Sequence, residues 1–478
     1  MAITTAWTGT GIDATPSASP GESNVELHVS SAREYAPAQT HPPTHADACA
    51  PATENDASSA EWRICRRLAW QTLPVLVFTY LAAYIDRVNV SFAALQLNGE
   101  LGFSDAVFGF GAGAFSLGYV VFEVPSNMIL QYVGARRWLT RIIVSWGVVI
   151  ALTALIATPK QFYVMRYLLG IAEAGLVPGI VYYISQAFPS YHRARVLSIF
   201  YVALPLAGVI GSPLAGFIMQ HLDGVMHVSG WKWMLIVESV PAFLAALFCW
   251  LRLDDDVTLS QRNAPAERAQ LASALRHHPA APSFPPDAIY TNGLVWAFCA
   301  IYFVVVFAIY GYTLWAPTII QSLGVSGDFK VGLVAALPNV VAIGVMIAVG
   351  RSVDRHRERR IHLAVLMLIT ALGLTMSALL HQHLYLSVLG LCIANACLLS
   401  MPPVFWSMPT AVLSPAAAAT GIAWISAIGN LGGFFGPYMV GHLKQSSGGL
   451  LLPVVMMSGC LLLGVLLTLL LPKRLVNP

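Results

Sequence analysis

The stretch MRYLLGIAEAGLVPGI, Met165 to Ile180, places an arginine and a glutamate inside an otherwise apolar segment. Arg166 and Glu173 are seven residues apart, so in a helix they share one face at a distance of about 10 Å. Charged groups at bilayer depth are costly unless they face a partner or a water-filled cavity. The stretch therefore predicts a membrane helix that carries an anion site and a protonatable neighbour. A static ion pair between two helices is the alternative.

The composition of the whole chain is typical of a polytopic membrane protein. Its 478 residues are 57% hydrophobic and 10% charged, with a mean hydropathy of +0.68, whereas soluble domains carry about 25% charged residues. A net charge of +3 with scattered basic residues argues against nucleic-acid binding. The seven cysteines are isolated, and no histidines have metal-ligand spacing. We therefore expect no metal and no cofactor.

Apolar runs long enough to cross about 30 Å of hydrocarbon follow one another from Gln71 onward. They predict an all-α membrane protein with twelve transmembrane helices in two six-helix bundles. The predicted spans are 71–94, 107–132, 139–158, 161–187, 196–221, 231–252, 291–322, 330–350, 362–380, 385–413, 418–443 and 450–472.

The polar segments divide the chain into five predicted regions. Residues 1–60 are rich in Ser, Thr, Ala and Pro, and we expect them to form a disordered cytoplasmic tail. The first bundle covers 61–252, the interval 253–290 is a cytoplasmic central loop, the second bundle covers 291–472, and 473–478 form a short cytoplasmic tail.

Glycines indicate that the two bundles are repeats of one another. Three glycines of the fifth predicted span return in the eleventh, each at an offset of 225 residues: Gly208, Gly211 and Gly216 correspond to Gly433, Gly436 and Gly441. QYVGARR at 131–137 and DRHRERR at 354–360 are similarly related, at an offset of 223. Parallel repeats of this kind are one known transporter architecture.

Basic residues predict the orientation in the membrane. Nearly all loop arginines lie on the side of the N-terminal flank, and the opposite loops carry only Lys160, Lys232, Lys330 and Lys444. Basic loops face the cytoplasm. Both termini and the central loop are therefore expected to be cytoplasmic.

Charged residues in the interiors of the predicted spans, away from the span ends, all belong to the first half: Asp86, Arg87, Glu123, Arg166, Glu173 and Glu238. The second half offers uncharged polar groups such as Tyr310, Asn339, Asn395, Ser426 and Asn430. The first half should therefore meet the charge of a ligand, and the second half its hydroxyls or rings.

The first span carries Tyr80, Tyr84, Arg87 and Ser91 on one face, as a helix beside a polar cavity would. Asp86 lies about 100° further around the helix. It could pair with either arginine when the site is empty, or it could lie near the helix end and face solvent.

Nine segments resemble the anion:cation symporter family of the major facilitator superfamily, over essentially all of residues 65–472. They are YIDRVNVSFA at 84–93, FEVPSNMIL at 122–130, GARRW at 134–138, MRYLLGIAEAG at 165–175, PLAGVIGSPLAG at 205–216, IVESVPA at 236–242, LWAPTII at 314–320, GRSVDR at 350–355 and GNLGGFFGP at 429–437. The resemblance implies alternating access and inward cotransport of organic anions with protons. Known members carry tartrate, galactonate, hexuronates, glucarate or phthalate.

The resemblance also implies roles for individual residues. Arg87 and Arg166 would grip carboxylate, Asp86 and Glu173 would exchange protons, and Tyr119 and Asn430 would contact substrate; Tyr84 and Tyr310 complete the expected substrate site. Arg136, Arg137, Asp354 and Arg355, in the two related loops, are expected to gate the carrier. Glu123 and Glu238 would lie near helix ends as structural or gating groups. The first loop has Gln131 where the superfamily often has aspartate, which leaves Asp354 to act as the latch.

Together these features predict a proton-coupled importer of a small organic anion in the inner membrane, working as a monomer in the lipid bilayer. A tartrate-like hydroxy acid or sugar acid is the expected substrate, with an aromatic carboxylate as the alternative. An uncoupled facilitator or exchanger would leave Asp86 and Glu173 without a role. A membrane sensor or enzyme is disfavoured, because the chain has no HExxH, GxSxG or P-loop motif.

Overall fold

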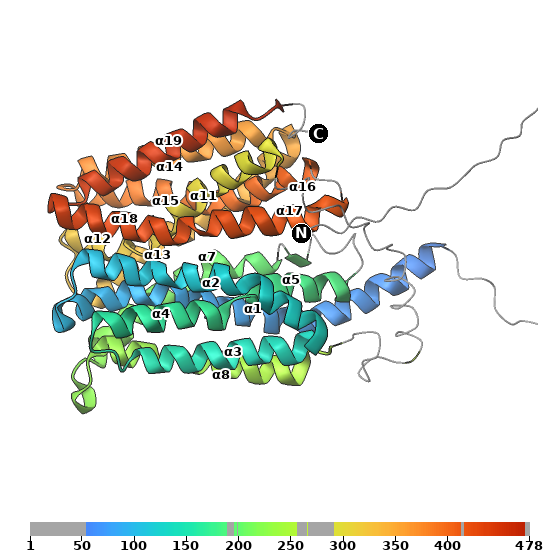
Figure 1. Cartoon of the computed structure of the whole chain (residues 1–478), viewed down its shortest axis with the longest axis horizontal. Helices are drawn as coiled ribbons and strands as arrows, with labels where there is room; N and C mark the ends of the chain where they lie inside the picture. Colours follow the sequence, from blue (N-terminus) through green and yellow to red (C-terminus); the bar gives the residue numbers. More distant parts are fainter. Residues whose placement is uncertain are drawn as a thin grey trace, which may run out of the picture. The chain divides into compact units, whose positions relative to one another are not determined.

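The computed structural model describes residues 54–188, 196–197, 199–255, 265, 291–412 and 415–473, and it folds them into helices with no strand among them (Figure 1). These residues belong to one compact unit that begins at Glu54. The predicted tail falls outside the described residues up to Thr53, and so do most of the central loop and residues 474–478. The first helix begins at Glu54, seven residues before the predicted start of the first bundle.

Helices of the first half of the chain pack against one another. They are α1 (Glu54–Leu101), α2 (Asp105–Val133), α3 (Ala135–Thr153), α4 (Pro159–Glu173), α5 (Leu176–Ala187), α7 (Ala203–His221) and α8 (Gly230–Arg252). A short 3-10 turn, η1 (Val225–His227), joins α7 to α8.

Helices of the second half form a corresponding group. They are α11 (Gly293–Thr313), α12 (Ala316–Ser322), α13 (Asp328–His356), α14 (Arg359–Leu379), α15 (Leu384–Ser407), α16 (Pro409–Val412), α17 (Pro415–Asn430), α18 (Gly432–Ser447) and α19 (Leu451–Leu470).

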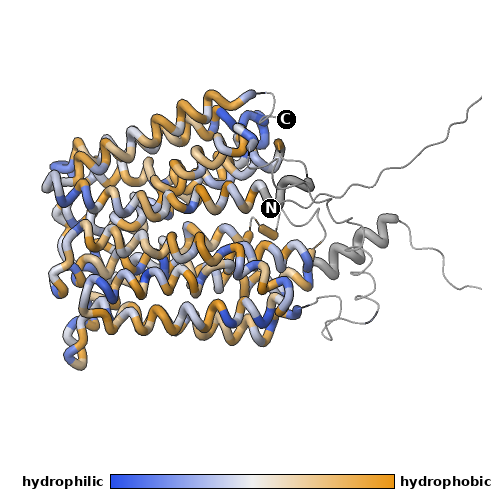
Figure 2. Tube along the Cα trace, viewed as in Figure 1, coloured by the Kyte–Doolittle hydropathy of each residue, from blue (hydrophilic) through white to orange (hydrophobic). Residues whose placement is uncertain are grey.

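Ten helical segments of the described chain are long and apolar enough to cross a membrane, and their middles are mostly hydrophobic (Figure 2). The other two expected spans are also helical. Helix α3 carries Arg136, Arg137 and Arg141 in its first two turns, and α17 and α18 are two 16-residue helices in succession. With these two, the chain has the twelve membrane helices that the sequence predicts.

Several predicted spans are interrupted instead of continuous. The span predicted at 161–187 consists of α4 and α5, because Ala174 leaves the helical conformation and Gly175 adopts a φ of 85°. A positive φ is accessible to glycine at little cost. The spans predicted at 291–322, 385–413 and 418–443 are likewise divided into helix pairs. The sequence predicts continuous helices at these positions, so these breaks differ from the prediction.

The two bundles meet mainly through α2 against α18 and α7 against α13. Small residues allow the backbones to approach closely: a Cβ added at Gly113 of α2 would lie 2.7 Å from the Phe434 carbonyl oxygen of α18. The repeated glycines have matching positions, since Gly208 of α7 faces Asn339 and Gly433 of α18 faces Ser116, each in the opposite bundle.

Polar contacts join the bundles at the end where α1 stops and α2 begins, called here the α1–α2 end. Lys444 Nζ lies 2.7 Å from Asp105 Oδ1, and Gln96 Nε2 donates to Asp328 Oδ2 over 2.7 Å. The Ala106 amide donates to Gln445, and the Phe329 amide donates to Gln220. Between described residues, the remaining hydrogen bonds from one bundle to the other lie near the middle of the spans.

Candidate functional site

Arg87 and Glu173 form a buried ion pair within the first bundle. Arg87 Nε of α1 donates to Glu173 Oε1 of α4 over 2.9 Å, and their side chains are 11% and 2% exposed. Arg87 Nη1 also reaches the Tyr310 hydroxyl of α11 at 3.4 Å, whereas its Nη2 is buried without a hydrogen-bond partner. The guanidinium therefore has a fixed counterion, a weak contact to the other bundle and a free donor.

Arg166 lies on α4 in a second buried position, 3% exposed. Its Nη2 makes only a long contact of 3.5 Å to the Ala112 carbonyl oxygen, and its Nε has no partner. Both arginines lie beside one ring, since their guanidinium carbons are 5.2 and 5.3 Å from the centroid of Phe115. Two incompletely bonded guanidinium groups thus lie beside one aromatic ring, with donors of the kind that bind carboxylates.

Local sequence explains why these groups come together. Helix α4 begins at Pro159 with a capping box made by Thr158 and Gln161, and it ends immediately after Glu173. Gly118 of α2 and Gly170 of α4 each face the backbone of the other helix without a side chain between. This close approach brings Phe115 and Tyr119 against Arg166 and Glu173.

Asp86 does not pair with either arginine in this structure. It is 5% exposed, and Trp146 Nε1 of α3 donates to its Oδ2 over 2.5 Å. Asn89 Nδ2 lies 3.5 Å from Oδ1. Asp86 thus faces away from Arg87, between α1 and α3. The prediction that it pairs with an arginine when the site is empty is wrong for this state, and so is the alternative that it caps the helix toward solvent.

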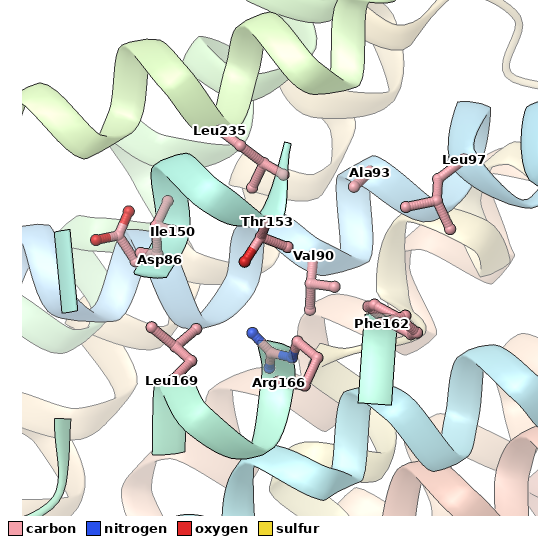
Figure 3. A pocket seen from close by; sticks show the side chains of 10 residues that line it. All are labelled: Asp86, Val90, Ala93, Leu97, Ile150, Thr153, Phe162, Arg166, Leu169 and Leu235. Atoms are coloured by element: carbon pink, nitrogen blue, oxygen red, sulfur yellow. The ribbon is translucent and has the colours of Figure 1, made fainter. Parts of the chain in front are cut away.

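A small cavity lies between Asp86 and Arg166 (Figure 3). Its volume, taken as the space open to the centre of a water molecule, is about 20 Å³, enough for roughly one water. Thr153 lines it between the two charged side chains, and apolar residues of α1, α3, α4 and α8 form the rest of its wall.

Glu123 lies inside helix α2, and not near a helix end as the sequence predicts. It is the nineteenth of the 29 residues of α2 and is 9% exposed. Ser426 of α17 donates to Glu123 Oε1 over 3.5 Å, and Asn430 Nδ2 donates to Ser426 over 3.3 Å. The Tyr119 ring, one turn earlier on α2, lies 5.1 Å from the Arg87 guanidinium carbon. Tyr119 therefore contacts the arginine site directly, and Asn430 is linked through Ser426 to Glu123, one turn further along α2.

Tyr84 lines a second cavity, which lies between the bundles. Its volume on the same measure is about 30 Å³. Asn339 of α13 and Asn395 of α15 line the other side, and Asn395 Nδ2 donates to Asn339 Oδ1 over 3.2 Å. This cavity offers hydroxyl and amide groups, but no charge.

The expected gating residues are far less buried. The Arg136 amide donates to Asp255 over 2.9 Å, and Arg137 Nε is 3.9 Å from the same carboxylate, with both partners exposed. Within the described part of the chain, Asp354 and Arg355 make no hydrogen bond or ion pair. These residues lie in the first turn of α3 and the last turn of α13 and not in loops as expected, and the two helix ends are not latched to each other in this state.

No group of three His, Cys, Asp or Glu side chains among the described residues could hold a metal ion.

Comparison with known proteins places this geometry in context. Residues 76–437 match the family model described as Major Facilitator Superfamily. A protein named "Putative metabolite transport protein NicT" from Pseudomonas putida is 39% identical over 414 residues, which are 86% of this chain and 95% of that relative. A "Putative tartrate transporter" from Agrobacterium vitis is 39% identical over 417 residues, 86% of this chain and 92% of the relative. The crystal structure of a D-xylose-proton symporter has a similar fold, with a TM-score of 0.71 at 16% identity over 84% of this chain and 98% of that one.

Proposed function

Because this chain belongs to the major facilitator superfamily, it is a multi-pass membrane transporter of an organic substrate, and we propose that it imports a small organic anion together with protons. The observation that best supports this proposal is the pair of buried arginines, Arg87 and Arg166, beside Phe115. Each has a guanidinium nitrogen without a hydrogen-bond partner. Guanidinium groups keep their charge and bind carboxylates bidentately.

We propose that Arg87 and Arg166 hold the carboxylate, while Tyr84, Tyr119, Tyr310 and Asn430 contact the remainder of the substrate. Side chains around the second cavity, such as Tyr84 and Asn339, carry hydroxyl and amide groups of the kind that bond the hydroxyls of a hydroxy acid or sugar acid, and the "Putative tartrate transporter" relative supports that choice. An aromatic carboxylate is the competing substrate class, favoured by the ring of Phe115 beside both arginines.

The proposed coupling starts from the Arg87–Glu173 pair. A carboxylate that reaches Arg87 competes with Glu173 for the same guanidinium. Glu173 then loses its counterion in a buried position, where a carboxyl group is favoured over an ionised carboxylate. Substrate binding and protonation of Glu173 therefore support each other, which is the thermodynamic requirement for symport. Asp86 is proposed as a second proton carrier.

The proposed orientation has both termini in the cytoplasm, so the α1–α2 end faces outward. The contacts Lys444 to Asp105 and Gln96 to Asp328 then close the carrier on the outside. We propose that Arg136, Arg137, Asp354 and Arg355 close the opposite end in the other state. The proposed bundles are 61–252 and 291–472, joined by a cytoplasmic loop at 253–290.

Uptake into proteoliposomes tests this function. The purified full chain is reconstituted, and labelled tartrate, a sugar acid and an aromatic carboxylate are each offered with and without an inwardly directed proton gradient. Symport predicts that one acid accumulates above its external concentration only when the gradient is present. Equal equilibration in both conditions would make the protein an uncoupled facilitator, and uptake of none of these acids would refute the anion assignment.

A further inference from the structure

Glu238 of α8 is a buried carboxyl group that the proposed transport cycle does not use. Its side chain is 2% exposed. It lies in the interior of α8, whereas the sequence predicts a position near a helix end. Neither carboxyl oxygen has a hydrogen-bond partner. An ionised carboxylate without a donor or a cation is strongly disfavoured in such surroundings, and such a group takes up a proton instead.

The neighbours of Glu238 supply no compensating positive charge. From α1, the Asp86 carboxyl disfavours a negative charge on Glu238, and the Asn89 amide lies near both carboxyl groups as a weak, uncharged donor. From α3, the Trp146 indole donates to Asp86 as well. The third neighbour, α7, has no charged residue before His221 at its end.

The two carboxyl groups therefore differ in what stabilises a negative charge. Asp86 accepts a hydrogen bond from the Trp146 indole, whereas Glu238 has only the Asn89 amide nearby, a donor that also lies 3.5 Å from Asp86 and is not within normal hydrogen-bond geometry of either Glu238 oxygen. Two like charges at close range in an apolar bundle repel each other strongly. One proton shared by the pair belongs on Glu238, and the charge belongs on Asp86.

Access to water also differs between the two. Asp86 lines the cavity that extends to Arg166 and has room for about one water molecule, whereas Glu238 does not line it (Figure 3). A water there has Asp86 as acceptor and the unpaired Arg166 Nε as donor. Asp86 is therefore the member of the pair that can contact a water in this cavity.

We propose that Glu238 holds a proton throughout the transport cycle, as a neutral carboxylic acid, and thereby leaves Asp86 as the member of the pair that titrates. This proposal rests on the proposed proton symport for its role in transport. It adds a proton-holding residue on the side of α1 that faces away from Arg87. Glu238 acts through Asp86, so it is a positioning residue and not a substrate ligand.

Infrared spectroscopy of the full chain in lipid tests the proposal, because a protonated carboxyl group has its own carbonyl-stretch band. At neutral pH the wild-type protein should show such a band that Glu238→Gln lacks. Asp86→Asn should retain that band, as should the matched control Glu100→Gln, whose carboxylate pairs with Lys232 at 3.0 Å. On acidification, the wild type should gain a further band that Asp86→Asn does not gain.

A Glu238→Gln spectrum identical to the wild type at neutral pH would mean that Glu238 is ionised, and would overturn the proposal. Where Glu238→Gln does not fold, Glu238→Asp keeps a carboxyl group in the bundle. Its band should then shift in frequency, and an unshifted band would overturn the proposal equally. Uptake is measured separately: gradient-independent uptake refutes the symport but leaves the infrared assignment intact, whereas a missing Glu238 band with intact symport refutes only this inference.

Discussion

The two bundles contribute different chemistry to one site. The first bundle holds every charged residue in the interior of a span, and the second contributes uncharged groups such as Tyr310, Asn339 and Asn430. The strong ion pair, Arg87 to Glu173, is internal to the first bundle. The contacts near the middle of the spans that cross to the second bundle are long, at 3.4 Å for Arg87 to Tyr310 and 3.5 Å for Glu123 to Ser426.

This division has a consequence for the energy of alternating access. When the bundles rock, a buried ion pair within one bundle stays intact, whereas one between bundles would have to break at a cost of several kcal/mol. The mid-span contacts between bundles are long and each has an uncharged hydroxyl as one partner, so they can be exchanged at a lower cost. The unequal distribution therefore lets the site hold charge without locking the carrier in one state.

The largest expected effect comes from removing the charge that pairs with Arg87. In Glu173→Gln the site is fixed in a neutral form, so substrate still binds and exchange between labelled and unlabelled substrate continues. Accumulation driven by a proton gradient should disappear, because no proton can be released inside. The control Glu100→Gln should still accumulate substrate. Continued accumulation by Glu173→Gln would assign coupling to Asp86 alone.

Next in size are changes to the arginines themselves. Arg87→Lys and Arg166→Lys keep the charge but lose the planar guanidinium, so substrate binding should weaken by about 1–3 kcal/mol, roughly 5- to 150-fold. Isothermal titration or thermal-shift titration measures this. Arg141→Lys, at an exposed arginine stacked on Trp138, is the matched control and should bind normally. Wild-type affinity in both buried variants would contradict the carboxylate clamp.

A smaller effect is expected from the second bundle. Tyr310→Phe removes the hydroxyl that Arg87 reaches at 3.4 Å, a neutral partner worth about 0.5–1.5 kcal/mol. Affinity should fall by roughly 2- to 10-fold, while the dependence on the proton gradient persists. Tyr438→Phe on α18 is the control. A loss as large as that of Arg87→Lys would show that the bundles share the recognition equally.

The smallest effect on binding is expected at the last turn of α13. Asp354→Asn lies far from the arginines and is exposed, so affinity should stay within about twofold while turnover slows. Equilibrium binding and initial uptake rates on the same preparation separate the two quantities. Collapsed affinity with normal turnover would mean that Asp354 acts in the site and not as a latch.

Much of the fold could be predicted because it depends on run length and glycine spacing. Twelve apolar runs and the repeated glycines at Gly208 and Gly433 can be recognised from the sequence alone. The helix breaks were missed, because Gly175 within an apolar run also fits a continuous helix. Glu123 and Glu238 were misplaced near helix ends. Each is followed within three residues by a proline, Pro125 or Pro241, which often marks a helix end, yet both helices continue through it.

The sequence points to the charged residues of the candidate site but not to their pairing. Charged residues are easily recognised within apolar runs. The helix period places Arg87 and Asp86 on different faces of the helix. Which partner each one meets depends on helices 60 or more residues away, such as Trp146 for Asp86 and Glu173 for Arg87. The ring of Phe115 was missed because phenylalanine in an apolar run looks like ordinary core.

The interruption of the fourth span gives it a joint immediately beyond Glu173. Helix α5 has 12 residues and packs against α2 and α3, which makes it a stiff rod about 18 Å long. A tilt of about 10° at Ala174 and Gly175 would displace its far end by roughly 3 Å, given that length. Glu173 is thus next to the joint between α4 and α5. A small rearrangement at its carboxyl group would therefore be amplified into a larger displacement at the far end of α5.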